Sequence, residues 1–223
     1  NIREVHDWIL CHCIGISVSF WFDRYQISLD NIDREKEVIS ELATELNLIQ
    51  STVENRENAF TFDLENLTMI INDSLQTANF TYPQLLIATT DYRGFSPSEE
   101  IYTSLKYDGG LKFIRFNSIK IAIESLYNGT KYGVIANMED EIVVQRDVLK
   151  YIQYNYPKLL VDIEKMEIAE SRKISIFAEI VQKDKTLKSL LTSKHRFMKN
   201  KLRFLQDYKN SLSLLMNLLQ VSY

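Results

Sequence analysis

The chain has 223 residues, of which 45% are hydrophobic and 25% are charged. This composition is typical of a folded protein and excludes a disordered tail. Its net charge of -4 gives no broad electrostatic reason to expect nucleic acid binding. Only six Gly and three Pro are present, and because both residues interrupt helices, their scarcity predicts an all-α fold.

The first informative segment is the uncharged run WILCHCIGISVSFWF, from Trp8 to Phe22. Both tryptophans of the chain, Trp8 and Trp21, lie at its ends, as in the aromatic belts of membrane proteins. As a helix the run covers about 22 Å, which is marginal against the ~30 Å core of a bilayer. We predict that residues 1–25 form a membrane anchor, with a buried core helix or a signal-peptide core as alternatives. The predicted anchor side chains are Trp8, Ile9, Leu10, Ile14, Ile16, Val18, Phe20, Trp21 and Phe22.

Two further groups of residues lie inside this run. Gly15 and Ser19 are four residues apart, a spacing that allows another span to pack closely or simply reflects the tolerance of membrane helices for small residues. Cys11, His12 and Cys13 are metal-ligand types, but neighbours one and two apart on a helix point in different directions. We therefore expect no metal site there.

Residues 26–82 are predicted to continue the anchor as one long membrane-proximal helix. Apolar residues recur there at alternating spacings of three and four, as in a heptad repeat. The positions of this first stripe are Ile32, Glu35, Ile39, Leu42, Leu46, Ile49, Val53, Arg56, Phe60, Asp63, Leu67 and Ile70. A stripe of this kind requires a partner helix.

The second stripe lies in the C-terminal part, residues 136–223, and can supply that partner. Its positions are Leu187, Leu191, Lys194, Met198, Lys201, Leu205, Tyr208, Leu212, Leu215 and Leu219. We expect the two stripes to pack within one chain as an antiparallel, coiled-coil-like bundle, with pairing between chains as the alternative.

The middle of the chain, residues 83–135, collects most of the Gly and Pro and predicts short helices and turns that form the distal tip of a hairpin. Ser96-Pro97-Ser98-Glu99 predicts a helix start, and Asp108-Gly109-Gly110 predicts its end. Further helices are expected at 117–127, ending at Asn128-Gly129, and at 139–156, ending at Pro157.

Two segments resemble an uncharacterised bacterial family of single-span, membrane-anchored helical proteins. They are CIGISVSFWF, followed by the charged DREKEVISELATEL, and SEEIYTSLKYDGGLKFI. The resemblance implies an N-terminus inside the cell and a body in the periplasm. It carries no catalytic signature, and the family implies no function for this chain.

Candidate chemistry in the rest of the chain is sparse. No nucleophile motif, P-loop or dinucleotide fingerprint occurs, so we predict no enzyme activity, no catalytic residue, no cofactor and no metal. The basic run from Lys194 to Arg203 is interpreted as the charged outer face of a helix, with contact to lipid or nucleic acid as the alternative.

The predicted function is that of a membrane-anchored scaffold or adaptor. Its expected partners are the bilayer and other membrane or periplasmic proteins, including a second copy of itself, and no nucleic acid. The alternative is a sensory or membrane-machine subunit that transmits a signal or ion-driven motion through the span, in which Asp23 at its end could take part in ion movement.

Overall fold

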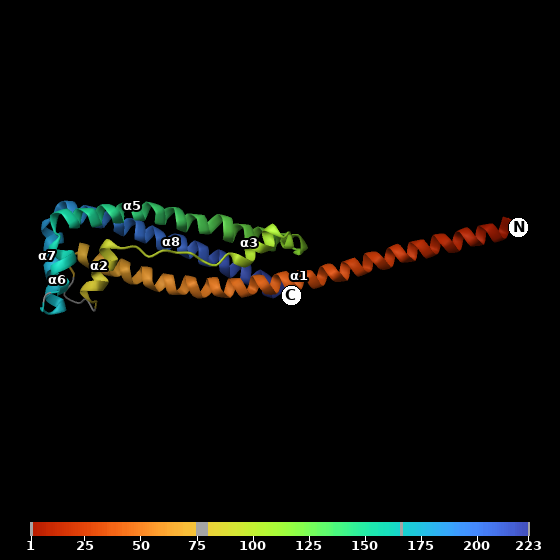
Figure 1. Ribbon diagram of the computed structural model, residues 1–223, viewed down its shortest axis with the longest axis horizontal. Coiled ribbons are helices and arrows are strands. Elements are labelled where there is room, and N and C mark those ends of the chain that lie inside the picture. The colour runs from red at the N-terminus through yellow and green to blue at the C-terminus, as the bar shows by residue number, and fades with distance from the viewer. Residues whose placement is uncertain (1, 75–79, 166, 223) are drawn as a thin grey trace.

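Figure 1 shows the computed structural model, which describes residues 2–74, 80–165 and 167–222, with the side chains of 15–74, 80–161 and 167–221. All secondary structure in these ranges is helical, which confirms the predicted all-α class. The elements are α1 (Ile2–Ile71), α2 (Tyr82–Thr90), α3 (Glu100–Tyr107), the 3-10 turn η2 (Gly110–Phe113), α4 (Asn117–Glu124), the π-helical turn η3 (Ser125–Thr130), α5 (Lys131–Asn155), α6 (Lys158–Lys165), α7 (Glu170–Lys183) and α8 (Lys185–Ser222).

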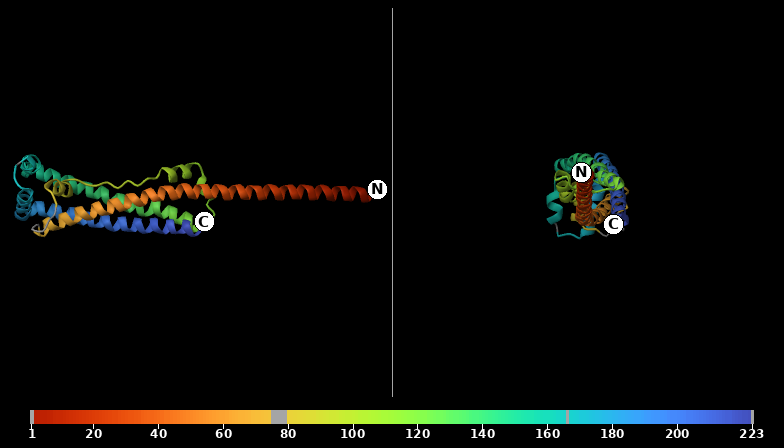
Figure 2. Two further views of the ribbon diagram at one scale, coloured as in Figure 1. Left: turned by 90° about the horizontal axis from the view of Figure 1, so that it is seen from below. Right: turned by 90° about the vertical axis from the view of Figure 1, so that its right-hand side faces the viewer.

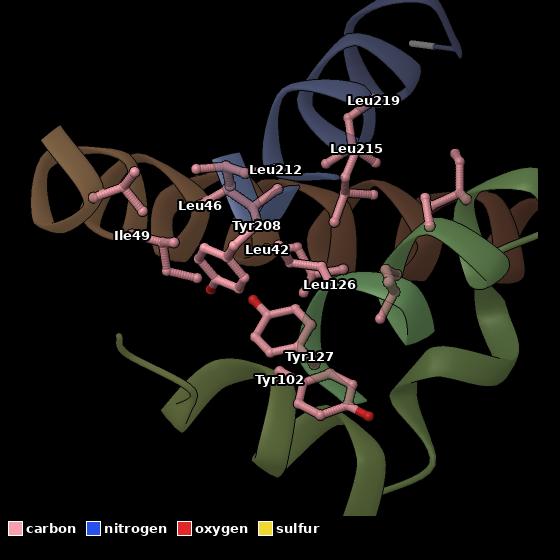
Figure 3. Packing of buried hydrophobic residues seen from close by; sticks show 14 of the residues in the cluster. Leu42, Leu46, Ile49, Tyr102, Leu126, Tyr127, Tyr208, Leu212, Leu215 and Leu219 are labelled. Atoms are coloured by element: carbon pink, nitrogen blue, oxygen red, sulfur yellow. The ribbon is translucent and has the colours of Figure 1, made fainter. Parts of the chain in front are cut away.

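The body is built around the long helices α1, α5 and α8, which lie side by side (Figures 1 and 2). In the first stripe, ten of the twelve positions are buried, and Ile32 and Arg56 are half-buried; in the second stripe all ten positions are buried. Helices α1 and α8 run in opposite directions along the body, as expected for a single chain that folds back on itself (Figure 1). Figure 3 shows how Leu46 and Leu212 from the two helices enter one core.

The third long helix, α5, was only partly predicted. The sequence indicates two helices, at 117–127 and 139–156, but the chain from α4 to α5 is one continuous run of helical turns. The predicted stop at Asn128-Gly129 falls in η3, where the backbone widens to a π-helical turn and continues. The stripe of α5 was hidden because its buried positions include Asn137, Glu141 and Gln145.

Of the predicted distal tip, residues 83–135, only α2 lies at the far end of the body. Helices α3 and α4 lie beside α1 and α8, and the far end of the body is formed by α2, α6 and α7 (Figure 1). Between them, residues 91–99 form an extended segment, which we call the strap, that runs back along the body from α2 to α3 (Figure 1). The strap returns the chain toward the anchor side before the next helix begins.

A buried carboxylate of α1 explains why α3 begins later than predicted. The helix starts at Glu100, and no side chain of its own caps it. The backbone amides of Ile101 and Tyr102 instead donate to the Glu45 carboxylate at 2.7 and 3.2 Å. Glu45 thus satisfies the open amides of a helix that is distant in sequence, a role that short-range capping rules do not reveal. The predicted end holds, since Gly109 adopts a φ of 72°.

Candidate functional site

The N-terminal part of α1 projects beyond the body, and Figure 2 shows it continuing in line with the bundle. We call residues 2–27 of this helix the arm, which as an α-helix is about 39 Å long. Every described side chain from residue 15 to residue 31 is exposed. The described side chains of the arm are therefore not packed against the described part of the body.

The described part of the arm is strongly apolar. Phe20 and Trp21 are each 66% exposed, although aromatic rings are the side chains that gain most from leaving water. At about 100° per residue, one side of the helix carries Ile16, Phe20 and Ile27, and the opposite side carries Val18, Phe22 and Tyr25. The apolar surface therefore covers two opposite sides of the helix instead of forming one stripe.

The polar groups of this segment are partly satisfied inside the helix. The Ser19 hydroxyl donates to the carbonyl of Gly15 at 3.0 Å, which lowers the cost of placing it in an apolar medium. Trp21 stacks on Tyr25 one turn later, with ring centroids 5.7 Å apart. The first charged side chains of the described arm are Asp23 and Arg24.

The predicted anchor residues divide into two groups. Ile16, Val18, Phe20, Trp21 and Phe22, together with Gly15 and Ser19, lie exposed on the arm. The side chains of Trp8, Ile9, Leu10, Ile14 and the Cys11-His12-Cys13 cluster lie outside the described residues. Within the part of the chain that the structure describes, no helix combines the length and the apolar character needed to cross a bilayer.

An ion pair between a buried carboxylate and an exposed guanidinium lies at the point where the arm leaves the body. Glu35 has no exposed surface, and its carboxylate accepts the backbone amide of Arg115 at 2.6 Å as well as the Arg115 guanidinium. Next to it, the guanidinium of Arg34 and the ammonium of Lys112 lie 5.2 and 5.0 Å from the centre of the Phe113 ring. These contacts join α1 to η2 and to the residues that follow it.

The second candidate site is a cluster of charged side chains inside the bundle. The Arg93 guanidinium in the strap donates to both carboxylate oxygens of Asp63, at 2.5 and 3.2 Å. Lys201 Nζ lies 2.6 Å from Glu141 Oε2 and 4.2 Å from the centre of the Phe60 ring. Both members of the Lys201–Glu141 pair are almost fully buried.

Lys194 completes this cluster and holds the strap. Its ammonium donates to the carbonyl of Thr89 at 3.1 Å and to that of Asp91, and it is 1% exposed. The side-chain amide of Gln145 donates to the carbonyl of Thr90. The cluster therefore uses its buried charges to bind backbone groups where α2 ends and the strap begins. These charged side chains have a structural role, because they are paired with one another or with backbone carbonyls.

Burial of Lys194 has a measurable consequence. Desolvation lowers its pKa to about 8, although Glu141, Asp63 and Asp91 oppose the shift. An unfolded lysine has a pKa near ~10.4, so between pH 8 and pH 10 the unfolded chain binds more protons than the folded one. We expect the free energy of unfolding of the wild type, relative to Lys194→Met, to rise by about 1 kcal/mol per pH unit over this range. Urea titrations at pH 7, 8, 9 and 10 measure it, and a constant difference would contradict it.

A third cluster of buried polar side chains surrounds Glu45. The Tyr127 hydroxyl donates to the Glu45 carboxylate at 2.5 Å, and the Tyr127 ring stacks on Tyr102 with centroids 4.0 Å apart. Figure 3 shows the hydroxyls of Tyr127 and Tyr208 facing the same region of the core. Tyr208 is buried, and its hydroxyl has no hydrogen-bond partner among the described residues. Burial next to these groups raises the pKa of both tyrosines.

Sequence reasoning missed four of these charges because each of them occupies a core position of a predicted stripe. Glu35, Asp63, Lys194 and Lys201 read as interruptions of otherwise apolar repeats. Polar residues at the core positions of a heptad were the available signal, since such residues need partners that the stripe itself does not supply.

The interpretation of the basic run from Lys194 to Arg203 as the outer face of a helix is correct for some of its cations and wrong for others. Arg196, Lys199 and Arg203 are exposed on α8, as expected for an outer face, whereas Lys194 and Lys201 point into the bundle. No group of three or more His, Cys, Asp and Glu side chains within the described ranges could hold a metal ion. Comparison of the chain with protein-family models, curated proteins and solved structures finds no match.

Proposed function

We propose that the protein is a non-enzymatic, membrane-anchored scaffold, in which the arm inserts into a bilayer and the helical body binds partner proteins away from it. The observation that carries this proposal is the exposed apolar surface on two opposite sides of the arm. A contiguous apolar surface of this kind is unfavourable in water and is a feature of membrane and protein contact sites.

The distribution of apolar side chains favours a bilayer over a single partner helix. A coiled-coil partner covers one stripe, and a helix lying on a membrane surface needs a polar face opposite its apolar face. The arm has apolar side chains on opposite sides. A helix with apolar side chains on opposite sides can bury both sides at once where it is surrounded by apolar material, as in a membrane.

The body has the properties of a spacer in this proposal. Its longest helix other than α1 is α8, with 38 residues, which corresponds to a length of about 57 Å. Because the arm continues in line with the bundle (Figure 2), the end formed by α2, α6 and α7 lies farthest from the arm. With the resemblance described above, we place the body in the periplasm.

One observation favours a signalling role as a second candidate. Helix α1 runs without interruption for 70 residues from the arm into the core. A rigid helix of this kind could carry a movement of the arm to the buried charge pairs of the body. This candidate predicts that arm variants change the protection of amides in the strap against hydrogen exchange, whereas the scaffold alone does not.

The test of the anchor is flotation of the full chain with vesicles of phosphatidylcholine and phosphatidylglycerol. We expect the wild type to float with the vesicles in high salt. The variant Val18→Asp/Phe20→Asp/Phe22→Asp should remain at the bottom of the gradient, because charges in the hydrocarbon core cost several kcal/mol.

A matched control keeps this test specific. Leu48→Asp/Val143→Asp/Leu214→Asp places three charges at exposed apolar positions of the body, and this variant should float like the wild type. Equal flotation of all three proteins, or recovery of the wild type in the soluble fraction, would contradict the anchor.

A further inference from the structure

One face of α8 carries a line of exposed positive charges. The cations are Lys185, Lys188, Arg196, Lys199 and Arg203, with Thr192 in the remaining position. Their spacings of three and four residues place all six on one side of the helix over about 27 Å. We call these five cations the basic stripe. Lys188 is half-buried and the other four are exposed.

The charges of the basic stripe are not paired with carboxylates within the described chain, and Lys188 Nζ donates to the neutral Gln182 side chain at 2.6 Å. None of the five forms an ion pair with a described carboxylate, and the first acid on this side of α8 is Asp207, one turn after Arg203 at the end of the stripe. Next to the stripe on the same helix lie neutral residues, including Ser189 and Asn200. Five like charges at this spacing repel one another, so the isolated face is electrostatically unfavourable.

Two contacts hold the arginine side chains in place. The Arg196 guanidinium lies 5.4 Å from the centre of the Phe197 ring, and that of Arg203 lies 4.9 Å from the Phe204 ring. Phe197 and Phe204 are themselves half-buried. Guanidinium groups fixed in this way lose less conformational entropy when they bind a carboxylate.

We propose that the basic stripe docks an acidic α-helix of a partner protein, whose Glu or Asp side chains follow the same spacing of three and four residues. The stripe is a single row of side chains along α8. An α-helix is about 10 Å wide, so one partner helix that lies along this row can cover all of it. Its carboxylates pair with the five cations in a fixed register, and the arginines can bind bidentately. This inference rests on the proposed scaffold function, because it specifies the kind of partner that the body holds.

Other anionic partners fit this face less well. A nucleic acid duplex is wider than the stripe and would extend over the neighbouring helices α1 and α5, which carry exposed acids such as Glu65 and Asp147. The stripe also lies along the side of the body, whereas the arm leaves from its end (Figures 1 and 2). A bilayer that holds the arm along the axis of the body does not reach it.

The test uses a synthetic 24-residue alanine-based helical peptide with Glu at spacings of three, four, four, three and four residues. A second peptide has the same composition with the Glu positions scrambled. We expect the full chain to bind the patterned peptide at least about tenfold more tightly than the scrambled one, in low salt. Binding should weaken as salt increases.

Two variants with equal net charge locate the binding site. Arg196→Glu/Lys199→Glu/Arg203→Glu reverses three of the five charges of the stripe, and Lys120→Glu/Arg146→Glu/Lys150→Glu reverses three exposed cations elsewhere. We expect the first to lose about tenfold or more in affinity for the patterned peptide and the second to stay close to the wild type. Circular dichroism checks that both variants are folded.

Several outcomes would overturn the proposal. Equal binding of the two peptides, or an equal loss in the two variants, would show that only net charge acts. Stripe-dependent binding of a DNA duplex or of anionic vesicles without binding of the patterned peptide would assign the face to a different partner. The peptide assay contains no lipid, so its result is independent of the flotation test of the arm.

Discussion

Replacing Leu46 with Asp is expected to unfold the body or to lower its free energy of unfolding by at least about 4 kcal/mol. Leu46 has no exposed surface and lies in the core cluster with Leu42, Ile49 and Leu212 (Figure 3). Asp at this position loses the packing of the leucine and places a carboxylate without a partner among apolar side chains.

A neighbouring position on the same helix provides the control. Leu48 is 58% exposed, so Leu48→Asp introduces the same charge and should change stability by less than about 0.5 kcal/mol. Urea unfolding followed by circular dichroism measures both variants, with the Leu205→Asp variant as the equivalent change on α8. Similar stability of the Leu46 and Leu48 variants would show that the two stripes are not packed against each other.

Removing the cation from the Lys201–Glu141 pair should cost about 3 kcal/mol at neutral pH. The variant Lys201→Met leaves Glu141, which is 1% exposed, as a buried carboxylate without its partner at 2.6 Å. The contact of the ammonium with the Phe60 ring is lost as well. Nearby Lys194 reduces the loss, because its charge also interacts with Glu141.

The double variant separates the pair from the cost of an unpaired charge. Lys201→Met/Glu141→Leu removes both charges and replaces them with apolar groups, and it should recover most of the stability that Lys201→Met loses. Chemical denaturation of the wild type, both single variants and the double variant gives the coupling energy. If the double variant is less stable by the sum of the two single losses, the two residues do not act as a pair.

The part of the fold that could be predicted from the sequence depends on regular periodicity. The stripe from Leu187 to Leu219 is buried at every position, because the spacing of apolar residues determines which side of a helix faces the core. The route of the strap could not be predicted in this way. It depends on Glu45 and Asp63, whose partners at Tyr102 and Arg93 are distant in sequence.

The same distinction applies to the candidate site. The apolar run before Asp23 could be recognised because it has no charged residues, and the structure places its described part outside the body. Three cations of the basic stripe, Arg196, Lys199 and Arg203, were recognised in the sequence only as part of the mixed basic run from Lys194 to Arg203. The structure separates this run into buried and exposed cations, a distinction that the sequence alone does not make.

The most direct test of the proposed anchor uses the two native tryptophans, since both lie in residues 8–21 and the body has none. In the variant Trp8→Phe, all tryptophan fluorescence comes from Trp21, which is 66% exposed without lipid. On addition of vesicles, we expect its emission to shift to shorter wavelength, and brominated acyl chains should quench it while aqueous acrylamide no longer does. Emission that stays at long wavelength and remains accessible to acrylamide in the presence of lipid would contradict insertion of the arm.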